Sequence, residues 1–318
     1  MHAIQFERYG PPEVLQYVTL PTPEPGPGEV RVKLQAAGVA PFDAKLRAGK
    51  LQAHFAPKLP KIPGRDGVGT IDKVGTGVKG HVVGDAVCVV ADMLSGTAAE
   101  MLVCIGERAV PRPSGLSTHQ AAALMQPGIS AWTAVVDTAH VSPGMRVLVH
   151  GGAGAVGSLM VQLCRHLGAE VSATCRASNR DYVAGLGASR TFAYDRQGED
   201  FGALRNQNVV FDLIGGGTHE RSYPVLRAGG QLVYLVAAPI VDRGAEFGVA
   251  VKRVMVADQP LVLMAVAQAA EQRVFQPRVA GVYSLRDAAK AHAALESGQV
   301  TRGRLVLDIE GNDAPPVS

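Results

Sequence analysis

Three closely spaced glycines near the middle of the chain are the strongest chemical signal in the sequence. Gly152, Gly154 and Gly157 match the pattern G-x-G-x-x-G, and the stretch 146–150 directly before them is apolar, as in a buried strand. After them, apolar residues recur with the period of one helix face. The first glycine permits a tight turn, the second lets backbone approach a pyrophosphate, and the third allows close helix packing. A strand, a glycine loop and a helix in this order predict a dinucleotide site.

The start of the predicted helix strengthens this interpretation. Ala155 and Val156 lie in its first turn, where backbone N–H groups have no partner within the helix. The positive end of the helix dipole adds to the attraction for phosphate. FAD and S-adenosylmethionine bind to loops of the same kind, and a turn without a ligand is a further alternative.

The residues after the next predicted strand bear on which dinucleotide is bound. An acidic residue about 20 positions after the loop would hold the ribose hydroxyls of NAD. Arg176 lies 19 residues after Gly157, Ser178 and Arg180 follow, and the first acidic residue is Asp181. Because a guanidinium pairs well with a 2′-phosphate, we expect NADPH. A solvated Arg176 without a ligand is the alternative.

Length and composition limit the class of protein that carries this site. The chain has 318 residues, enough for two domains at about 150 residues each. With 47% hydrophobic and 19% charged residues, it is neither disordered nor fibrous. The net charge of +3 is dispersed, so nothing indicates a nucleic acid or a membrane as partner.

The cysteines and the apolar runs point to a cellular compartment. Cys88, Cys104, Cys164 and Cys175 lie far apart without a C-x-x-C pair, so neither a zinc lobe nor a disulfide framework is indicated. No apolar run approaches the ~18 residues that span a bilayer, and residues 1–8 lack a signal-peptide pattern. We expect a cytoplasmic protein, because scattered thiols fit a reducing environment.

The texture of the sequence changes near residue 120. Before it, short alternating stretches such as 29–34 and 86–90 are broken by Gly and Pro, which predicts a small β-barrel or sandwich. After it, apolar strands alternate with helices, which predicts a parallel sheet covered on both faces. The predicted strands there are 146–150, 170–175, 208–214 and 231–237, and a second short helix capped by Ser178 runs to about residue 187.

The last part of the chain is expected to return to the first domain. It contains two predicted helical stretches within 260–298, the later one at 287–296, and a closing strand at 304–309. The expected domains are therefore a β-rich domain at 1–122, a nucleotide-binding α/β domain at 123–260 and a returning segment at 261–318.

Taken in order, several short motifs resemble the zinc-independent quinone oxidoreductase branch of the medium-chain dehydrogenase/reductase superfamily. The resemblance covers about residues 4–309, and each motif alone is loose. The motifs are Tyr9–Leu15, Gly28–Val30, Leu59–Asp66, Gly69–Gly75, Gly84–Val87, His150–Gly157, Phe211–Gly216, Ala291–Gly298 and Arg302–Leu307.

The resemblance implies a GroES-like barrel with an inserted Rossmann domain, a doubly wound parallel sheet, and an active site in the cleft between them. It also implies NADPH-dependent reduction of a quinone or an α,β-unsaturated carbonyl, and a homodimer. Ser130 matches the family hydroxyl near the nicotinamide. Tyr194 lies where a family tyrosine often approaches the adenosine end, and the residues near Val236 match the stretch that lines the carboxamide.

Two departures from the wider superfamily matter. Zinc-dependent relatives carry a His-Glu pair where this chain has Arg65 and Asp66, and they carry four close cysteines that are missing here. Since zinc needs thiolate or imidazole ligands at defined spacing, we expect no metal. Many relatives also have Asn where this chain has Ala40, which removes an amide expected to face the nicotinamide.

Three residues are candidates for catalytic roles. Such a reductase must stabilise the anion that develops on its substrate. Lys45 is the candidate for electrostatic support, with a solvated charge as the alternative. Asp43 is expected to hold either Lys45 or the chain itself. Tyr9 is either a donor at the mouth of the site or a partly buried structural tyrosine. Leu51, His54 and Phe55 are candidate lining residues.

The sequence therefore predicts a zinc-independent, NADPH-dependent oxidoreductase that transfers hydride to a quinone or enone. One alternative is an enoyl-thioester reductase. Another is a catalytically silent NADPH-binding sensor or structural relative, which the alanine at position 40 keeps open.

Overall fold

The computed structural model describes residues 1–53, 55–236 and 239–311, and it divides into two compact units. The terminal unit is formed by Met1–Gln126 together with Asp258–Ser318, and the central unit is Pro127–Ala257. The chain thus leaves the terminal unit after Gln126 and returns at Asp258. The boundaries expected from the sequence were 122/123 and 260/261.

The terminal unit is built on a seven-stranded sheet in the order β14-β15-β3-β4-β5-β7, with β6 also paired to β3. Only the β14–β15 pair is parallel. A separate antiparallel pair is formed by β1 and β2. The strands are β1 (His2–Gln5), β2 (Gln16–Thr19), β3 (Glu29–Val39), β4 (Asp66–Val74), β5 (Ala86–Val90), β6 (Met101–Ile105), β7 (Ala109–Pro111), β14 (Val279–Ser284) and β15 (Arg304–Asp308).

Alternation along β3 explains how this sheet buries its core. Val30, Val32 and Leu34 point to one face and are almost fully buried, while Lys33 between them is exposed. They pack with apolar residues of β4, β5 and β6. The strand predicted at 29–34 is confirmed, and it continues to Val39 because the following small apolar residues are also buried.

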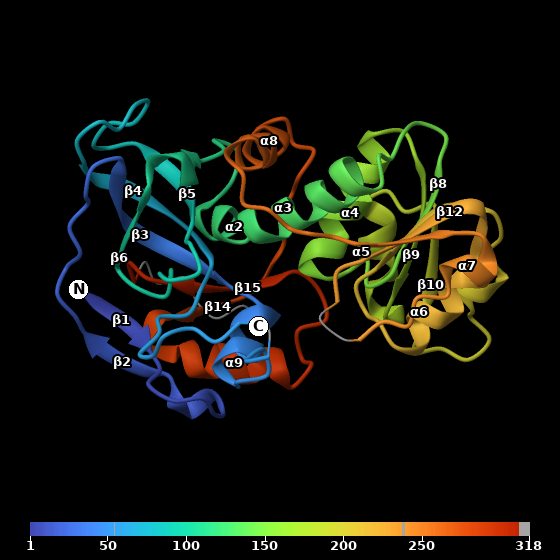
Figure 1. Cartoon of the computed structure of the whole chain (residues 1–318), viewed down its shortest axis with the longest axis horizontal. Helices are drawn as coiled ribbons and strands as arrows, with labels where there is room; N and C mark the ends of the chain where they lie inside the picture. Colours follow the sequence, from blue (N-terminus) through green and yellow to red (C-terminus); the bar gives the residue numbers. More distant parts are fainter. Residues whose placement is uncertain (54, 237–238, 312–318) are drawn as a thin grey trace. The chain divides into compact units, whose positions relative to one another are not determined.

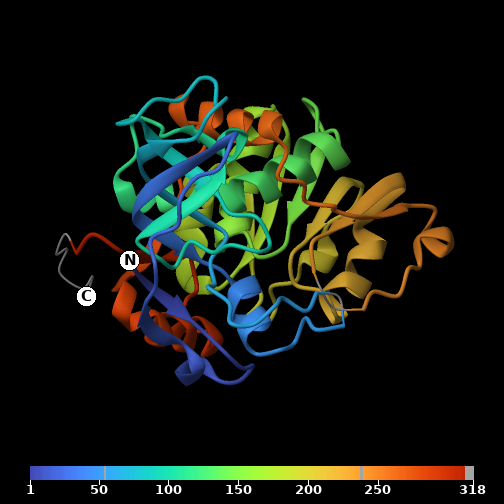
Figure 2. The ribbon, with the colours of Figure 1, turned by 60° about the vertical axis from the view of Figure 1, so that its left-hand side comes forward.

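Helices at the edges complete the terminal unit: α1 (Pro41–Arg47), α2 (Thr118–Ala122), α8 (Pro260–Glu271) and α9 (Ala288–Glu296). The first two were not predicted. α9 comes from the end of the chain, yet it shares a core cluster with the first strand through Ile4 and Ala291. Figures 1 and 2 both show α9 beside β1 and β2, so the returning segment closes this unit.

The central unit is a six-stranded, fully parallel sheet in the order β10-β9-β8-β11-β12-β13. This order is that of a doubly wound Rossmann sheet, which confirms the predicted fold class. The strands are β8 (Arg146–Val149), β9 (Glu170–Cys175), β10 (Arg190–Ala193), β11 (Gln207–Asp212), β12 (Leu226–Tyr234) and β13 (Ala250–Arg253). The β12 strand begins five residues before the stretch predicted from its apolar run.

The helices that follow strands of this sheet are α4 (Ala155–His166), α5 (Arg180–Gly185), α6 (Gly217–Ser222) and α7 (Gly244–Phe247). The chain enters the unit within α3 (Met125–Trp132). Figure 1 shows α4 on one side of the strands and α7 on the other. The predicted cap of the second helix is wrong. Ser178 lies inside a 3-10 turn, Ala177–Asn179, and α5 begins after Asn179 without a side-chain cap.

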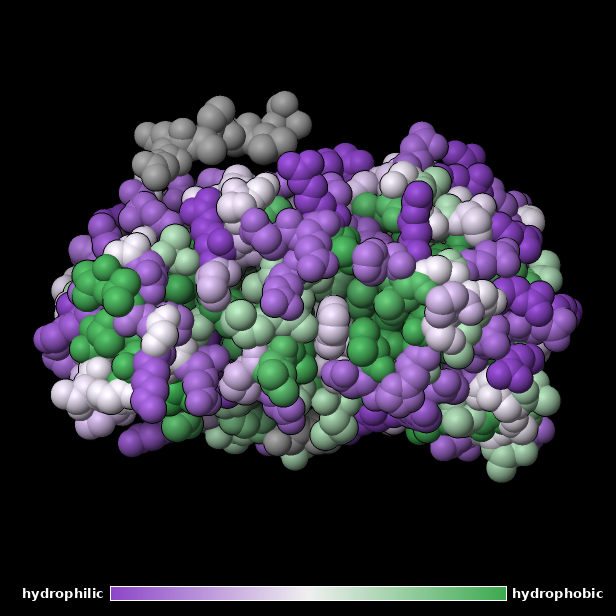
Figure 3. Space-filling model, turned by 90° about the horizontal axis from the view of Figure 1, so that it is seen from above, coloured by the Kyte–Doolittle hydropathy of each residue, from purple (hydrophilic) through white to green (hydrophobic). Residues whose placement is uncertain are grey.

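Hydrophobic residues also reach the surface. Figure 3 looks down on the side where Figure 1 shows α8, and there hydrophobic and hydrophilic residues are interspersed. Leu261 and Met264 of α8 are 82% and 40% exposed. Within the described part of the chain, none of the helices combines the length and the apolar character needed to cross a membrane.

Candidate cofactor site

The glycine loop joins β8 to α4 at the carboxyl edge of the central sheet. A Cβ on Gly157 would overlap the carbonyl of Gly151, and a Cβ on Gly152 would lie 2.8 Å from the Cβ of Ala173. Both positions are therefore restricted to glycine by packing. The left-handed turn falls at Gly151, with φ of +75°, one residue before the glycine to which the sequence pattern assigned it.

The start of α4 leaves space and donors for a ligand. Gly154 is the N-cap residue and provides no side-chain cap. A Cβ there would meet only the Gly151 carbonyl, at 3.5 Å, so packing within the fold does not require this glycine. Because the N–H groups of the first helical turn, from Ala155 to Gly157, have no partner within the helix, the loop fits a pyrophosphate.

Two of the predicted cofactor residues meet at the ends of neighbouring strands. Arg176 follows β9, Tyr194 follows β10, and Arg176 Nε donates to Tyr194 Oη at 3.3 Å. Tyr194 is 61% exposed. A carboxylate is also close by, because Asp195 accepts the backbone N–H of Ala177 at 2.8 Å. An exposed guanidinium thus stands 19 residues after the last glycine of the loop.

The other predicted arginine is occupied. Arg180 forms an ion pair with Glu199, which comes from the segment after β10. Ser178 is exposed between the two arginines. Both Arg176 and Arg180 were predicted to contact the cofactor, but their surroundings differ. Among the described residues, only Arg180 is neutralised by a carboxylate.

A cavity of about 380 Å³ lies at this carboxyl edge, entirely within the central unit. It contains both polar and aromatic side chains and includes the partners of both arginines. Its lining residues are His150, Thr174, Phe192, Tyr194, Glu199, Asp200, Phe201, Ile214, Thr218 and Arg221. Position, size and lining suit the adenosine half of a dinucleotide.

His150, which precedes the glycine loop, is fully buried. Its Nδ1 lies 3.2 Å from Thr174 Oγ1 and its Nε2 lies 3.0 Å from Ser222 Oγ. Burial lowers the pKa of His150 to about 4, so the ring is neutral at pH 7. Thr174 Oγ1 also accepts the N–H of Gly151 at 3.1 Å. His150 therefore supports the glycine loop from below through Thr174, which contacts both His150 and Gly151.

A buried network that the sequence reasoning missed shapes the turn after β11. Asp212 Oδ1 accepts the N–H groups of Ile214 and Gly215, at 2.9 and 2.8 Å, and Asp212 Oδ2 lies 2.8 Å from His219 Nδ1. His219 Nε2 lies 3.2 Å from Tyr223 Oη. The sequence signal that could have found this network is Asp212 followed by Gly215 and Gly216, at the end of a predicted strand.

Ser130 and Val236, both assigned by resemblance, also lie in the central unit. Ser130 is half-buried in α3. Val236 follows β12 and packs beside the turn that Asp212 organises, because a Cβ on Gly215 would lie 3.3 Å from Val236 Cγ2. All the predicted cofactor residues thus belong to the central unit.

The three catalytic candidates lie in the terminal unit. The Asp43 carboxylate accepts the N–H of Ala40 at 2.9 Å and that of Gly64 at 3.3 Å, so it holds the chain and forms no described ion pair with Lys45. Burial raises the pKa of Asp43 to about 6, because desolvation outweighs its backbone hydrogen bonds and nearby Arg304.

Lys45 and Tyr9 differ in exposure. Lys45 is exposed on α1, whereas Tyr9 is half-buried against a core cluster, with its ring centroid 6.4 Å from that of Phe6. Ala40 is the N-cap of α1. Of the candidate lining residues, Leu51 is buried, Phe55 is half-buried, and His54 lies outside the described residues.

Asp66 and Arg304 form a buried ion pair next to Asp43. Arg304 donates to both carboxylate oxygens of Asp66, at 2.6 and 2.5 Å. Arg304 is 4% exposed and Asp66 is 0% exposed. Asp66 Oδ2 also accepts the N–H of Gln126 at 2.8 Å. Arg65, its neighbour, pairs with Asp258. At the position of the His-Glu pair of zinc relatives, Arg65 therefore binds an aspartate side chain and Asp66 binds an arginine side chain.

The donor atoms available to a metal are few. Among the residues that the structure describes, no group of three or more His, Cys, Asp or Glu side chains is arranged to hold a metal ion.

Comparison with known families agrees with this geometry. Residues 26–144 match the alcohol dehydrogenase GroES-like domain, and residues 186–307 match the family described as zinc-binding dehydrogenase. The chain belongs to the medium-chain dehydrogenase/reductase superfamily, and its relatives place it in the quinone oxidoreductase branch.

Two curated relatives and one solved structure show how far the likeness extends. The chloroplast envelope quinone oxidoreductase homolog of Arabidopsis thaliana is 31% identical, over 86% of this chain and 85% of the relative. The quinone oxidoreductase of Pseudomonas aeruginosa is 30% identical, over 96% and 98%. The structure of the quinone oxidoreductase from Coxiella burnetii superimposes with a TM-score of 0.86 at 30% identity, over 97% and 99% of the two chains.

Proposed function

We propose that this oxidoreductase uses NADPH to reduce a quinone or an α,β-unsaturated carbonyl without a metal ion. The observation that carries the choice of cofactor is Arg176, whose exposed guanidinium is bonded to Tyr194 and has no carboxylate partner among the described residues. The central unit supplies the cofactor site, and the terminal unit supplies the catalytic candidates.

The residues of the central unit fit a nicotinamide dinucleotide. When bound, the cofactor supplies a hydride to the substrate. The N–H groups at the start of α4 hold the pyrophosphate, and Gly154 leaves room for its approach. Arg176 pairs with the 2′-phosphate, and Tyr194 orients its guanidinium. Arg180 contributes less, because Glu199 already neutralises it.

The substrate class is supported by what relatives are called. Besides the quinone oxidoreductases, similar proteins include the 2-methylene-furan-3-one reductase of Solanum lycopersicum, 33% identical, and a 2-haloacrylate reductase of Burkholderia, 29% identical. Both names describe a carbon–carbon double bond conjugated with a carbonyl group. For this chain we take an electron-poor alkene or a quinone as the acceptor.

The terminal unit contributes charge and rigidity. Lys45, exposed on α1, provides a cation for the anion that develops during reduction. Asp43 is a positioning residue, because its carboxylate ties the start of α1 to Gly64. Tyr9, half-buried against the core, is assigned a secondary role as a donor.

The test follows nicotinamide absorbance with NADPH or NADH, and with a benzoquinone or a short-chain enone as acceptor. Rapid loss with NADPH and little with NADH is expected. Oxidation of NADH alone would overturn the cofactor assignment. Tight NADPH binding without oxidation by any acceptor would instead favour a silent binding protein, and selective use of enoyl thioesters would favour the enoyl reductase.

Two further properties belong to this proposal. We propose a cytoplasmic homodimer, supported by four buried cysteines without disulfide bonds and by the family resemblance. Light scattering on purified protein tests the dimer, because a monomeric mass at micromolar concentration would contradict it.

A further inference from the structure

A second cavity lies in the central unit at the amino edge of the sheet, the end opposite the glycine loop. Its volume is about 120 Å³, room for roughly four water molecules. Four strands contribute their first residues to its lining: Arg146 of β8, Glu170 of β9, Arg190 of β10 and Gln207 of β11. The cavity is therefore a product of the parallel sheet itself.

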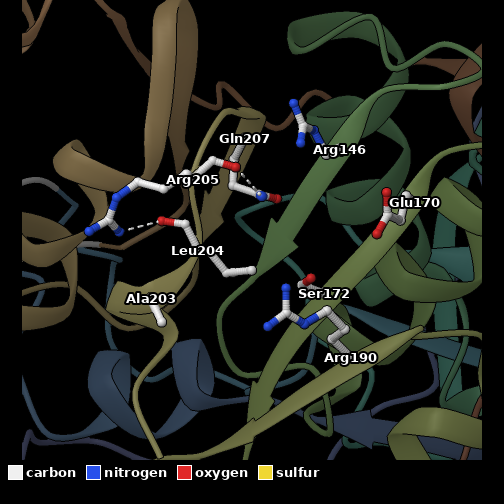
Figure 4. A pocket seen from close by; sticks show the side chains of 8 residues that line it. All are labelled: Arg146, Glu170, Ser172, Arg190, Ala203, Leu204, Arg205 and Gln207. Atoms are coloured by element: carbon white, nitrogen blue, oxygen red, sulfur yellow. Dashed lines mark hydrogen bonds between the residues drawn. The ribbon is translucent and has the colours of Figure 1, made fainter.

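The strand register brings polar side chains together on one face. Arg146 is paired with Glu170, and Ser172 with Arg190. Since side chains two residues apart share a face, all four project to the same side. Figure 4 shows them across the cavity from the segment that carries Leu204 and Gln207.

The charged residues Arg146, Glu170 and Arg190 are exposed at the rim of this cavity, and they form no ion pairs among the described residues. Among the described residues, neither Arg146 nor Arg190 has a carboxylate within ion-pair distance, and Glu170 has no cation. The Arg205 guanidinium is turned away and donates to the Leu204 carbonyl at 2.7 Å (Figure 4). The side chains that remain carry two positive charges and one negative charge.

Ser172 provides an independent observation. The residue is 4% exposed and lines the cavity, yet its hydroxyl has no hydrogen-bond partner among the described residues. The hydroxyl opens onto the cavity, so a ligand there could form a hydrogen bond with it without displacing a protein group. Arg190 is paired with Ser172 in the sheet register. Its guanidinium packs over the Phe192 ring, with Arg190 Cζ 5.3 Å from the ring centroid.

We propose that this cavity binds a small oxyanion of the phosphate class, as a free ion or as the head group of a phosphate ester. Arg190 provides a charge-assisted donor and Ser172 provides its hydroxyl. Arg146 supplies the second positive charge, and Glu170 opposite it limits the net charge of the site to that of one cation. This site is separate from the cofactor's phosphates, which the opposite edge of the sheet would hold.

The experiment measures thermal stability during titration with inorganic phosphate, in protein saturated with NADPH so that the cofactor site is filled. Chloride at equal ionic strength is the reference, and glycerol 3-phosphate is a second arm. We expect a saturable rise of about 2 °C or more over chloride. A response to phosphate alone identifies the free ion as ligand, and an equal response to the ester identifies a head group.

Two variants and a matched control make the test specific. Arg190→Gln and Ser172→Ala should each raise the phosphate dissociation constant, by about tenfold for the arginine and less for the serine. Arg302→Gln, which removes an exposed charge from the terminal unit, should leave it unchanged. NADPH affinity and far-ultraviolet circular dichroism should match wild type in all three.

Three outcomes would overturn the site. The first is an equal phosphate response in Arg190→Gln and wild type. The second is a phosphate response that NADPH-free protein shows and NADPH-saturated protein does not, which would place phosphate in the cofactor site. The third is no response to either anion. Because NADPH binding is measured separately, failure here is distinguishable from failure of the proposed function.

Discussion

The two units organise buried polar groups in different ways. In the terminal unit, buried ions hold the backbone: Arg304 pairs with Asp66, and Lys61 donates to the carbonyls of Met93 and Ser95. In the central unit, the carboxyl edge is built from glycine backbone over the neutral His150. These buried ions of the terminal unit therefore bind groups of the fold itself, whereas the start of α4 in the central unit leaves N–H groups available to a ligand.

The ions of the terminal unit also mark where the chain leaves and returns. Gln126, the last residue before the central unit, donates its N–H to Asp66, and its side chain donates to Asp258 at 3.4 Å. Asp258 is the first residue after the chain returns, and it also forms ion pairs with Arg65 and Arg108. The difference between the units suggests distinct ways to damage each one.

The largest expected effect is loss of the buried pair. Arg304→Met leaves Asp66 as a buried charge without its partner, which should cost about 3–5 kcal/mol of unfolding free energy. Urea denaturation measures it. Arg31→Met, which breaks a more exposed pair with Asp72, should cost no more than about 1 kcal/mol. Equal losses would contradict the claim that burial makes the Asp66–Arg304 pair costlier to break.

The next largest effect is a difference in acid sensitivity: lowering the pH should destabilise the central unit more than the terminal unit. Burial lowers the pKa of His150 to about 4 from 6.5, so the unfolded state binds more protons between these values. Stability therefore falls as pH drops through this window, by about 3 kcal/mol in total. His292 does the same in the terminal unit, but Asp43, with its pKa raised to about 6, acts in the opposite sense.

Hydrogen exchange at pH 6.5 and 4.5 measures this difference. The central unit should lose more protection than the terminal unit. Asp43→Asn removes the compensating group and should make the terminal unit as acid-sensitive as the central one. Greater loss in the terminal unit of the unmodified protein would contradict the opposing signs.

A pair of glycine variants tests how the central unit keeps its edge open. Gly157→Ala forces a methyl group against the Gly151 carbonyl, which should cost about 1–3 kcal/mol of stability as well as cofactor binding. Gly154→Ala fits the fold and should weaken NADPH binding alone, because its methyl group lies where the pyrophosphate approaches. Calorimetry with NADPH, beside thermal unfolding, separates the two; equal effects on stability would contradict the packing argument.

The smallest expected effect concerns the two arginines. Arg176→Ala should reduce the preference for NADPH over NADH about tenfold, the loss of one charge-assisted pair. Arg180→Ala should change it much less, because Glu199 neutralises Arg180. Ratios of kcat/KM for the two cofactors measure both. An unchanged ratio in Arg176→Ala would remove the basis for choosing NADPH.

Local patterns predicted the parts of the fold that depend on periodicity. The β9 strand and the start of α4 were predicted to the residue, because the apolar run and the glycine loop define them. The seven-residue α1 was missed, since it is too short for a repeat and its start is held by Asp43 and Pro41. Ser178 was a reasonable cap by type, but the chain turns there before α5 begins.

Contacts between distant segments were beyond the sequence. Glu199 neutralises Arg180 only because the β10 turn brings it back across 19 residues. Asp43 meets Gly64, and Asp66 meets Arg304, through the register of β3, β4 and β15. The sequence thus showed which residue types could act, whereas the fold decides which of them already have partners.

The most direct test of this account is a calorimetric titration of the purified protein with NADPH and with NADH. The proposed cofactor site predicts that NADPH binds at least about tenfold more tightly, with the difference lost in Arg176→Ala. NADH binding as tightly as NADPH, or more tightly, would contradict the role assigned to Arg176.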